Sequence, residues 1–161
     1  MYSVIIPSVG RLKYLNELLE SIFSQSLPPL EIIILLDFNM HCKSIQEKIN
    51  TNKICKIIFC NDMNLSQKRN YGTKISKTEY LMFSDDDDLW DVDKGKQVFE
   101  SLKRNLIVTH DYKKFGNIVN NKKSFLGTHN KLINKKTIIY GANIYGGGSS
   151  LSANKEVFTL F

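Results

Sequence analysis

Apolar positions in the first part of the chain follow two different spacings. Residues 3–6 form a short run of strand type, whereas from Leu12 to Phe23 apolar residues recur three and four positions apart, as on one face of a helix. Pro28 and Pro29 end that helix, and residues 31–36 follow as Glu-Ile-Ile-Ile-Leu-Leu, with apolar side chains on both alternating faces. A strand of this kind indicates a parallel sheet that helices cover on both sides.

The same alternation continues along the chain. It predicts a weak helix at 43–49, a strand at 56–60, a helix at about 66–75, a strand at 79–83, a helix from 91 to about 103, and strands at 106–110 and 136–140. Residues 146–150 form a flexible glycine- and serine-rich loop. We therefore expect a single α/β domain over residues 1–161, with a doubly wound, mostly parallel, Rossmann-like sheet that binds its ligands at the carboxyl ends of the strands.

Four consecutive aspartates, Asp85 to Asp88, follow one of these predicted strands directly. Their charges repel one another unless a cation or hydrogen-bond donors compensate. If the segment is extended, Asp85 and Asp87 point to the same side and form a carboxylate pair suited to one hard divalent cation. The alternative is an acidic turn that caps the next helix, which is the role that we assign to Asp91 and Asp93.

Two further positions are candidates for nucleotide contacts. Asp37 follows the predicted strand at 31–36, so its carboxylate is expected at the same sheet edge, within reach of a base or ribose. Lys68 and Arg69 lie early in the helix predicted at about 66–75, and a helix amino terminus favours anions such as phosphate. The alternative for these two side chains is a solvent-exposed basic helix face.

Composition and charge narrow the class of protein. Hydrophobic residues make up 42% and charged residues 24% of the 161 residues, as in a single globular domain. The net charge of +6 suits an anionic partner, but no interleaved basic and aromatic motif favours nucleic acid, so we expect none. No apolar stretch is long enough to span a bilayer, and we expect a cytoplasmic protein that can associate peripherally with the inner face of the membrane. The three cysteines lack zinc-site or disulfide spacing and are expected to be free thiols.

Taken in order, these segments resemble glycosyltransferase family 2, whose members are inverting enzymes with the A-type α/β fold. Residues 3–8 resemble the opening strand of the family, residues 64–72 its Asn/Arg-Asn-x-Gly segment, and residues 79–90 the strand that leads into its D-x-D motif and the following aromatic. The resemblance implies metal ligation by Asp85 and Asp87. It implies nucleotide contacts from Pro7, Ser8, Arg11, Asp37, Arg69, Asp85 and Asp86, and a position on the donor-sugar or acceptor side for Gly147, Gly148 and Ser149.

The resemblance also implies a reaction. The expected function is metal-assisted, inverting transfer of a sugar from a nucleoside-diphosphate sugar, most commonly a UDP-sugar, to a glycan or lipid-linked acceptor in polysaccharide biosynthesis, with Mn²⁺ or Mg²⁺ as the cofactor. The alternative is a catalytically incomplete, metal-dependent sugar-nucleotide-binding module. In the family the general base comes from a downstream Glu-Asp motif, whereas this sequence ends at Phe161, so we expect the chain to be the amino-terminal part of such an enzyme and assign no catalytic base.

Two positions depart from the family pattern. Val9 stands where the family often has a tyrosine that packs on the base. Asp37 is followed by Phe38, which either replaces that stacking surface or belongs to the core.

Overall fold

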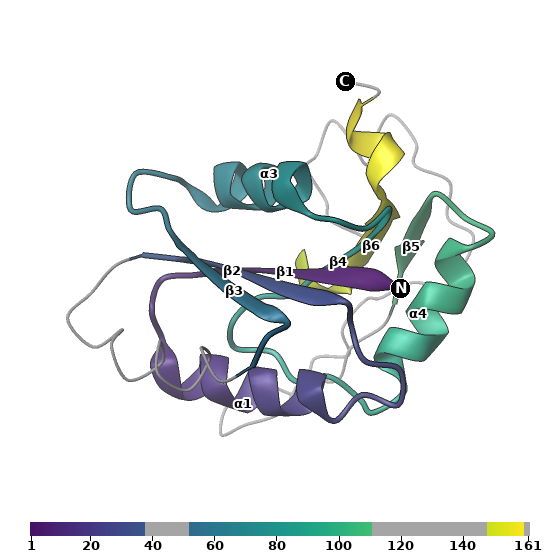
Figure 1. The fold of residues 1–161 in the computed structure, drawn as a ribbon, viewed down its shortest axis with the longest axis horizontal. Coiled ribbons are helices and arrows are strands. Elements are labelled where there is room, and N and C mark those ends of the chain that lie inside the picture. Colours follow the sequence, from purple (N-terminus) through teal and green to yellow (C-terminus); the bar gives the residue numbers. More distant parts are fainter. Residues whose placement is uncertain (38–51, 111–147, 160–161) are drawn as a thin grey trace, which may run out of the picture.

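The computed structural model describes residues 1–37, 52–110 and 148–159, which form a mixed six-stranded sheet with helices on both faces (Figure 1). Four strands are parallel to their neighbours, in the order β3-β2-β1-β4, and β6 and β5 extend this sheet beyond β4. Strand β6 is antiparallel to both β4 and β5. The strands are β1 (Tyr2–Ser8), β2 (Glu31–Leu36), β3 (Cys55–Phe59), β4 (Tyr80–Phe83), β5 (Ile107–Thr109) and β6 (Leu151–Asn154).

Three helices and two short 3-10 turns complete the described part of the chain. They are α1 (Leu12–Phe23), α3 (Leu65–Ile75), α4 (Lys94–Leu102), η1 (Gly148–Ser150) and η2 (Lys155–Thr159). Helix α1 and helix α4 share one core cluster with the sheet, whereas α3 lies on the opposite face. The predicted α/β fold with helices on both faces is thereby confirmed.

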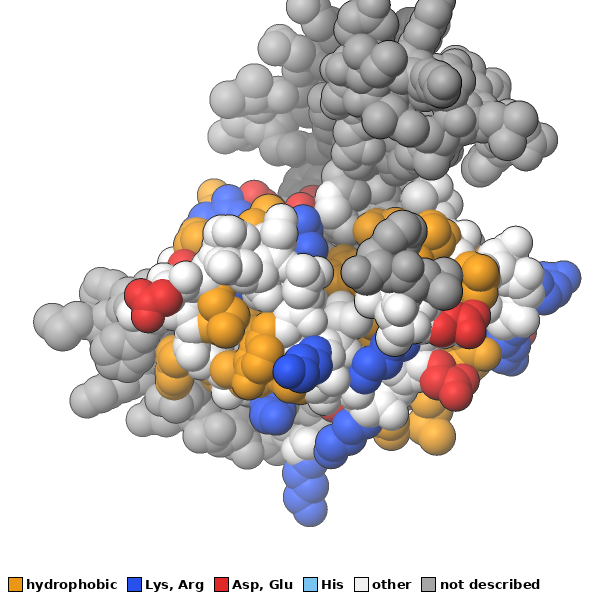
Figure 2. All heavy atoms as spheres, turned by 90° about the horizontal axis from the view of Figure 1, so that it is seen from above, with side chains coloured by type: hydrophobic (Ala, Val, Ile, Leu, Met, Phe, Trp, Pro, Cys, Tyr) orange, Lys and Arg blue, Asp and Glu red, His pale blue; other side chains and the backbone are white. Residues whose placement is uncertain are grey.

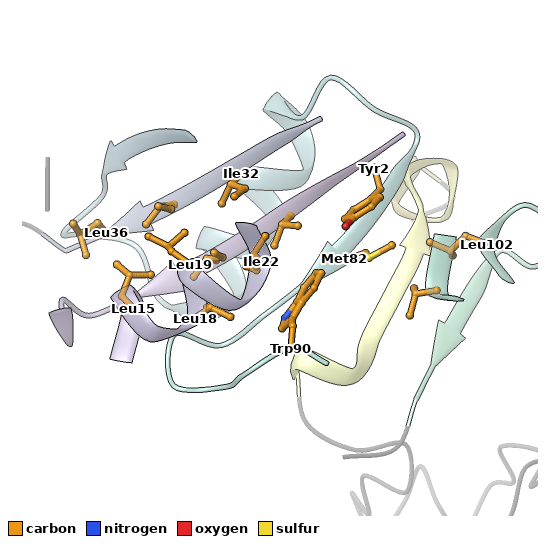
Figure 3. Packing of buried hydrophobic residues seen from close by; sticks show 14 residues of the cluster. Tyr2, Leu15, Leu18, Leu19, Ile22, Ile32, Leu36, Met82, Trp90 and Leu102 are labelled. Carbon is orange, nitrogen blue, oxygen red and sulfur yellow. The ribbon is translucent and has the colours of Figure 1, made fainter. Parts of the chain in front are cut away.

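The side chains of the central strands alternate between two hydrophobic clusters, one on each face of the sheet. Ile32, Ile34 and Leu36 pack toward α1, and Figure 3 shows this cluster with Leu15, Leu18 and Trp90. Ile33 and Leu35 join the cluster on the face of α3. All of the β2 residues are buried, which is the physical reason for the run without a polar face that the sequence shows at 31–36.

Helix α3 approaches the sheet closely at Gly72. A Cβ atom placed there would lie 2.6 Å from the Ile5 side chain and 2.9 Å from that of Leu35, so only glycine allows this packing distance. The helix is also fixed at its start, where Asn64 accepts from the Gln67 backbone N–H at 2.9 Å and Gln67 accepts from the Asn64 N–H at 2.8 Å. Both features set the position of Lys68 and Arg69, which lie between them in the helix.

Several predicted elements shift or lie outside the described residues. Helix α4 begins at Lys94 rather than at residue 91, because residues 92–93 form a turn before it. Residues 148–150, predicted as part of a flexible loop, form the 3-10 turn η1, which runs directly into β6. The helix predicted at 43–49 and the strand predicted at 136–140 fall outside the described residues.

The surface over α3 carries dispersed charge. In the view from that side, lysine and arginine side chains lie between hydrophobic and uncharged ones in several separate places (Figure 2). Within the described parts of the chain, no helix combines the length and the apolar character that crossing a membrane requires.

Candidate functional site

The candidate site lies where three neighbouring strands end. Strand β1 ends at Ser8, which pairs in register with Leu36 at the end of β2, and Ile5 of β1 pairs with Phe83 at the end of β4. Because these strands are parallel, Ser8, Asp37 and the aspartates that follow β4 all lie along one edge of the sheet. This is the edge at which open α/β sheets bind ligands.

The aspartates 85–88, called the acidic turn from here on, do not form an extended segment. The backbone N–H of Asp88 donates to the carbonyl of Asp85 at 3.4 Å, and Asp86 and Asp87 occupy the turn between them. The prediction of strict alternation is therefore wrong, because alternation requires extended backbone. Burial separates the carboxylates instead: the Asp86 side chain is 2% exposed, while those of Asp85 and Asp87 are 34% and 42% exposed.

Asp86 is held by residues that follow or end β1. Its carboxylate accepts a 2.5 Å hydrogen bond from the Ser8 hydroxyl and a second bond from the Arg11 guanidinium. Arg11 also donates to Asp87 at 2.7 Å. The chain folds back in this way because Gly10 takes a positive φ of 89°. A buried carboxylate with two charge-assisted partners acts first as an anchor for the acidic turn.

Asp85 pairs with Arg69 from α3. The guanidinium nitrogen Nη2 lies 2.5 Å from Asp85 Oδ1, and a Cβ atom at position 148 would overlap the same guanidinium, so Gly148 allows a close approach. Burial raises the pKa of Asp85 above its ordinary value, the Arg69 charge offsets part of that rise, and Asp88 and Asp87 add to it. Arg69 Nε is buried and has no hydrogen-bond partner among the described residues.

Lys68 points into the sheet edge rather than toward solvent. Its ammonium donates to Asp37 Oδ1 at 2.6 Å and to the Ser8 carbonyl at 3.0 Å, and the residue is only 3% exposed. The alternative of an exposed basic helix face is thus wrong for Lys68. Instead Lys68 links the ends of β2 and β1, and Ser8 continues this link to the acidic turn.

Ser149 reaches the acidic turn from η1. Its hydroxyl accepts a 2.6 Å hydrogen bond from the Asp85 backbone N–H, while its carbonyl accepts from the Lys94 ammonium at 3.0 Å. The structure therefore brings Ser149, Gly148, Asp85 and Arg69 together, although about sixty residues of sequence separate Ser149 from Asp85. Gly147 falls outside the described residues.

Comparison with known proteins decides the family. The model of the family described as glycosyl transferase family 2 matches residues 3–153 of the chain. The protein belongs to glycosyltransferase family 2. Two relatives, both described as uncharacterized glycosyltransferases of Haemophilus influenzae, are 30% identical to it. The alignments cover 65% and 82% of this chain but only 35% and 54% of the relatives, so the chain spans about a third and about half of their lengths.

Solved structures support the same fold. S. aureus TarS, residues 1–349, superposes with a TM-score of 0.75 at 20% identity over 98% of this chain and 48% of that one. Its complex with UDP-GlcNAc gives 0.73 at 19% identity over 98% and 46%. The mannosyltransferase PcManGT of Pyrobaculum calidifontis, in complex with GDP-Man and Mn²⁺, gives 0.59 at 16% identity over 67% and 34%. At these identities the likeness shows the fold alone.

The oxygen ligands available at the acidic turn meet only part of what a hard divalent cation needs. Asp85 and Asp87 offer exposed carboxylate oxygens, the ligand type that Mg²⁺ and Mn²⁺ prefer. Among the residues that the structure describes, no group of three or more potential metal ligands converges. Each of the two carboxylates also pairs with an arginine, Asp85 with Arg69 and Asp87 with Arg11, so a metal held here would need further ligands from a bound molecule or water.

Sequence reasoning missed one residue of this glycosyltransferase site. Lys94 contacts Ser149 and lies with its ammonium 4.1 Å from the centre of the Trp90 ring. A lysine that begins a helix carries no sequence signal for this arrangement, because the partner Ser149 is supplied by a distant segment. The role of Lys94 becomes apparent only from the fold.

Proposed function

We propose that this chain is the sugar-nucleotide-binding domain of a metal-assisted, inverting glycosyltransferase, formed by residues 1–161 as one unit. The observation that carries the proposal is the meeting of Asp37, Arg69 and the acidic turn at one edge of the sheet. Two partly exposed carboxylates, those of Asp85 and Asp87, beside the Arg69 guanidinium suit a diphosphate and its cation. The TarS complexes with UDP and UDP-GlcNAc favour a uridine nucleotide as the donor.

Each residue has a distinct proposed role. Asp37 accepts hydrogen bonds from the base or ribose, and Lys68 fixes its carboxylate. Arg69 binds the diphosphate with guanidinium N–H groups that do not contact Asp85. Ser8 and Arg11 act chiefly by holding Asp86, which fixes the position of the acidic turn relative to the sheet. Pro7 precedes Ser8 in β1 and contributes only the backbone that brings Ser8 to the edge.

The metal belongs to the leaving-group side of the reaction. Asp85 and Asp87 would hold Mn²⁺ or Mg²⁺, and the Mn²⁺ in the PcManGT complex supports this choice of ion. When bound, the cation supplies Lewis-acid stabilisation of the charge that develops on the departing diphosphate. Gly148 and Ser149, which contact Arg69 and Asp85, lie on the donor-sugar side.

Inversion requires a base that takes the proton of the acceptor hydroxyl as it attacks the anomeric carbon. Of the described carboxylates at the site, Asp86 is buried in its pairing with Arg11 and Ser8, and Asp85 is paired with Arg69. We assign neither to this role. The acceptor that we propose is a glycan or a lipid-linked glycan, and the net charge of +6 supports a site of action at an anionic membrane surface.

The proposal is tested by binding and turnover together. Isothermal titration with UDP, UDP-GlcNAc and GDP-mannose, each with and without Mn²⁺, should show metal-dependent binding of a sugar nucleotide, and release of free nucleoside diphosphate reports transfer or hydrolysis. Asp87→Asn should abolish the metal-dependent part, whereas Glu100→Gln, which changes an exposed carboxylate that pairs with Lys103 near the far end of α4, should not. Absence of any sugar-nucleotide binding would refute the proposal.

The second candidate function is a binding module that does not turn over its ligand. It is favoured by the fact that the chain spans only 35% and 54% of its curated relatives. Metal-dependent binding without nucleotide release, under conditions where the chain is folded, would favour the module over the active transferase.

A further inference from the structure

Lys94 is in an electrostatically unfavourable place for a lysine. It is the first residue of α4, where the helix dipole presents its positive end, and its side chain is largely withdrawn from solvent. Burial lowers its pKa to about 8, although Asp88 and Asp85 act in the opposite direction. Lys94 carries its charge although both the helix dipole and burial disfavour it, which suggests a role other than stabilising the fold.

The contacts of Lys94 show what that use is. The ammonium donates a 3.0 Å hydrogen bond to the Ser149 carbonyl and lies over the Trp90 ring. Ser149 in turn accepts from the Asp85 backbone N–H at 2.6 Å. Ser149 is therefore held from two sides, by α4 through its carbonyl and by the acidic turn through its hydroxyl.

A closed ring of contacts results. Gly148, next to Ser149, packs against the Arg69 guanidinium, and Arg69 pairs with Asp85 at 2.5 Å. Lys94 contacts this ring from α4 through the Ser149 carbonyl, and it thereby helps to fix how closely η1 lies against the acidic turn. Loss of its hydrogen bond leaves η1 held by the Ser149 hydroxyl, by the His110 N–H that donates to the Ser150 carbonyl, and by the strand pairing of β6.

We propose that Lys94 is a positioning residue that holds η1 against the acidic turn and thereby selects for the sugar-bearing nucleotide over the free nucleoside diphosphate. This inference rests on the proposed function, since it assigns the η1 side of the site to the sugar. The base or ribose is assigned to Asp37, which Lys68 fixes, and this pair does not involve Lys94. Arg69 adjoins Gly148, so the affinity for the diphosphate is expected to change as well, but less than the affinity for the sugar nucleotide.

Three variants test the inference. Lys94→Met keeps an unbranched apolar stem over Trp90 but loses the donor, and Lys94→Arg keeps a charged donor. Lys103→Met is the matched control. The Lys103 ammonium also lies over an aromatic ring, 4.8 Å from the centre of the Phe99 ring, but Lys103 is exposed at the far end of α4 and pairs with Glu100. Dissociation constants for UDP and UDP-GlcNAc are measured by titration calorimetry in the presence of Mn²⁺.

The expected result is a change in the ratio of the affinities for UDP-GlcNAc and UDP. Lys94→Met should lose about three- to tenfold more affinity for UDP-GlcNAc than for UDP, the size expected for one hydrogen bond that holds η1. Lys94→Arg should recover part of the ratio, and Lys103→Met should leave it unchanged. An equal loss for both ligands, or no loss in a folded variant, overturns the inference while leaving the proposed function standing.

A separate outcome keeps the two claims distinguishable. If the wild-type chain binds neither nucleotide, the proposed function fails. If Lys94→Met does not fold, Ser149→Ala provides the second route, because it removes the hydrogen bond between η1 and the acidic turn and should lower the same ratio of UDP-GlcNAc to UDP affinity. A folded Ser149→Ala with an unchanged ratio contradicts the inference.

Discussion

The hydroxyl of Ser8 donates a 2.5 Å hydrogen bond to the carboxylate of Asp86, seventy-eight residues later in the chain. This contact joins the end of β1 to the acidic turn, and Arg11 completes it from the start of α1. Asp86 is thus buried at the sheet, while Asp85 and Asp87 on either side of it are partly exposed. The metal-binding geometry that we propose depends on a residue that the metal does not touch.

Removing the Ser8 hydroxyl should destabilise the fold. In Ser8→Ala the buried Asp86 carboxylate loses one of its two partners, and we expect the free energy of unfolding to fall by about 1–3 kcal/mol. Urea unfolding followed by circular dichroism measures this change. Ser24→Ala removes an exposed hydroxyl that bonds only to the Ser21 carbonyl, and should cost less than about 0.5 kcal/mol. Equal losses in the two variants would contradict the anchoring role of Ser8.

Arg11 should compete with a divalent cation for the acidic turn. Its guanidinium already neutralises Asp86 and Asp87, so Arg11→Gln is expected to raise the affinity for Mn²⁺ in the absence of nucleotide. Electron paramagnetic resonance of free Mn²⁺ measures that affinity directly. The control is Arg104→Gln, an exposed arginine after α4. An unchanged or weaker Mn²⁺ affinity in folded Arg11→Gln would show that Arg11 does not occupy the cation's place.

Gly148→Ala should disturb Arg69 specifically. The added methyl group would overlap the guanidinium that pairs with Asp85, so that either Arg69 or η1 must move. We expect UDP affinity to fall about tenfold if Arg69 binds the diphosphate, which corresponds to the loss of one charge-assisted hydrogen bond. Calorimetric titration measures the affinity, and the melting temperature shows whether the fold is retained. Wild-type affinity would mean that Arg69 lies outside the nucleotide site.

The lysine at the start of α4 predicts an uncommon pH dependence of stability. An unfolded lysine keeps its proton up to its ordinary pKa of 10.5, whereas Lys94 in the folded chain loses it near pH 8. Between these values the unfolded chain binds more protons, so this group makes the folded state more stable as the pH rises. The free energy of unfolding of the wild type, relative to that of Lys94→Met, should therefore increase from pH 7.5 to pH 9.5. A constant difference across that range would contradict the effect of burial on Lys94.

The sequence predicted the sheet well because its central strands lack a polar face and its helices have regular apolar spacing. The strand pairing of β6 was not predicted, since Leu151–Asn154 is short and its partner β4 lies about seventy residues earlier. Antiparallel pairing of a late segment with an edge of the parallel sheet leaves no periodic signal in the chain.

The common location of several candidate residues was predicted from the sequence, whereas their contacts with one another were not, and their binding of nucleotide and metal stays a prediction. Asp37, Arg69, Asp85 and Asp86 do meet at one sheet edge, as parallel strands require. The different burial and partners of the aspartates in the acidic turn were not predictable, because they depend on the turn at Asp86 and on the chain folding back at Gly10 to bring Arg11 close. The inward direction of Lys68 likewise depends on how closely Gly72 lets α3 approach the sheet.

The most direct test of the account is the location of the metal in a crystal of the chain grown with UDP and Mn²⁺. Anomalous diffraction on either side of the manganese absorption edge identifies the element that gives each peak. We predict one anomalous peak in coordination contact with carboxylate oxygens of Asp85 and Asp87 and with oxygens of the UDP diphosphate, with Asp86 still bound to Ser8. A manganese ion elsewhere, or UDP bound away from the acidic turn, would contradict the account.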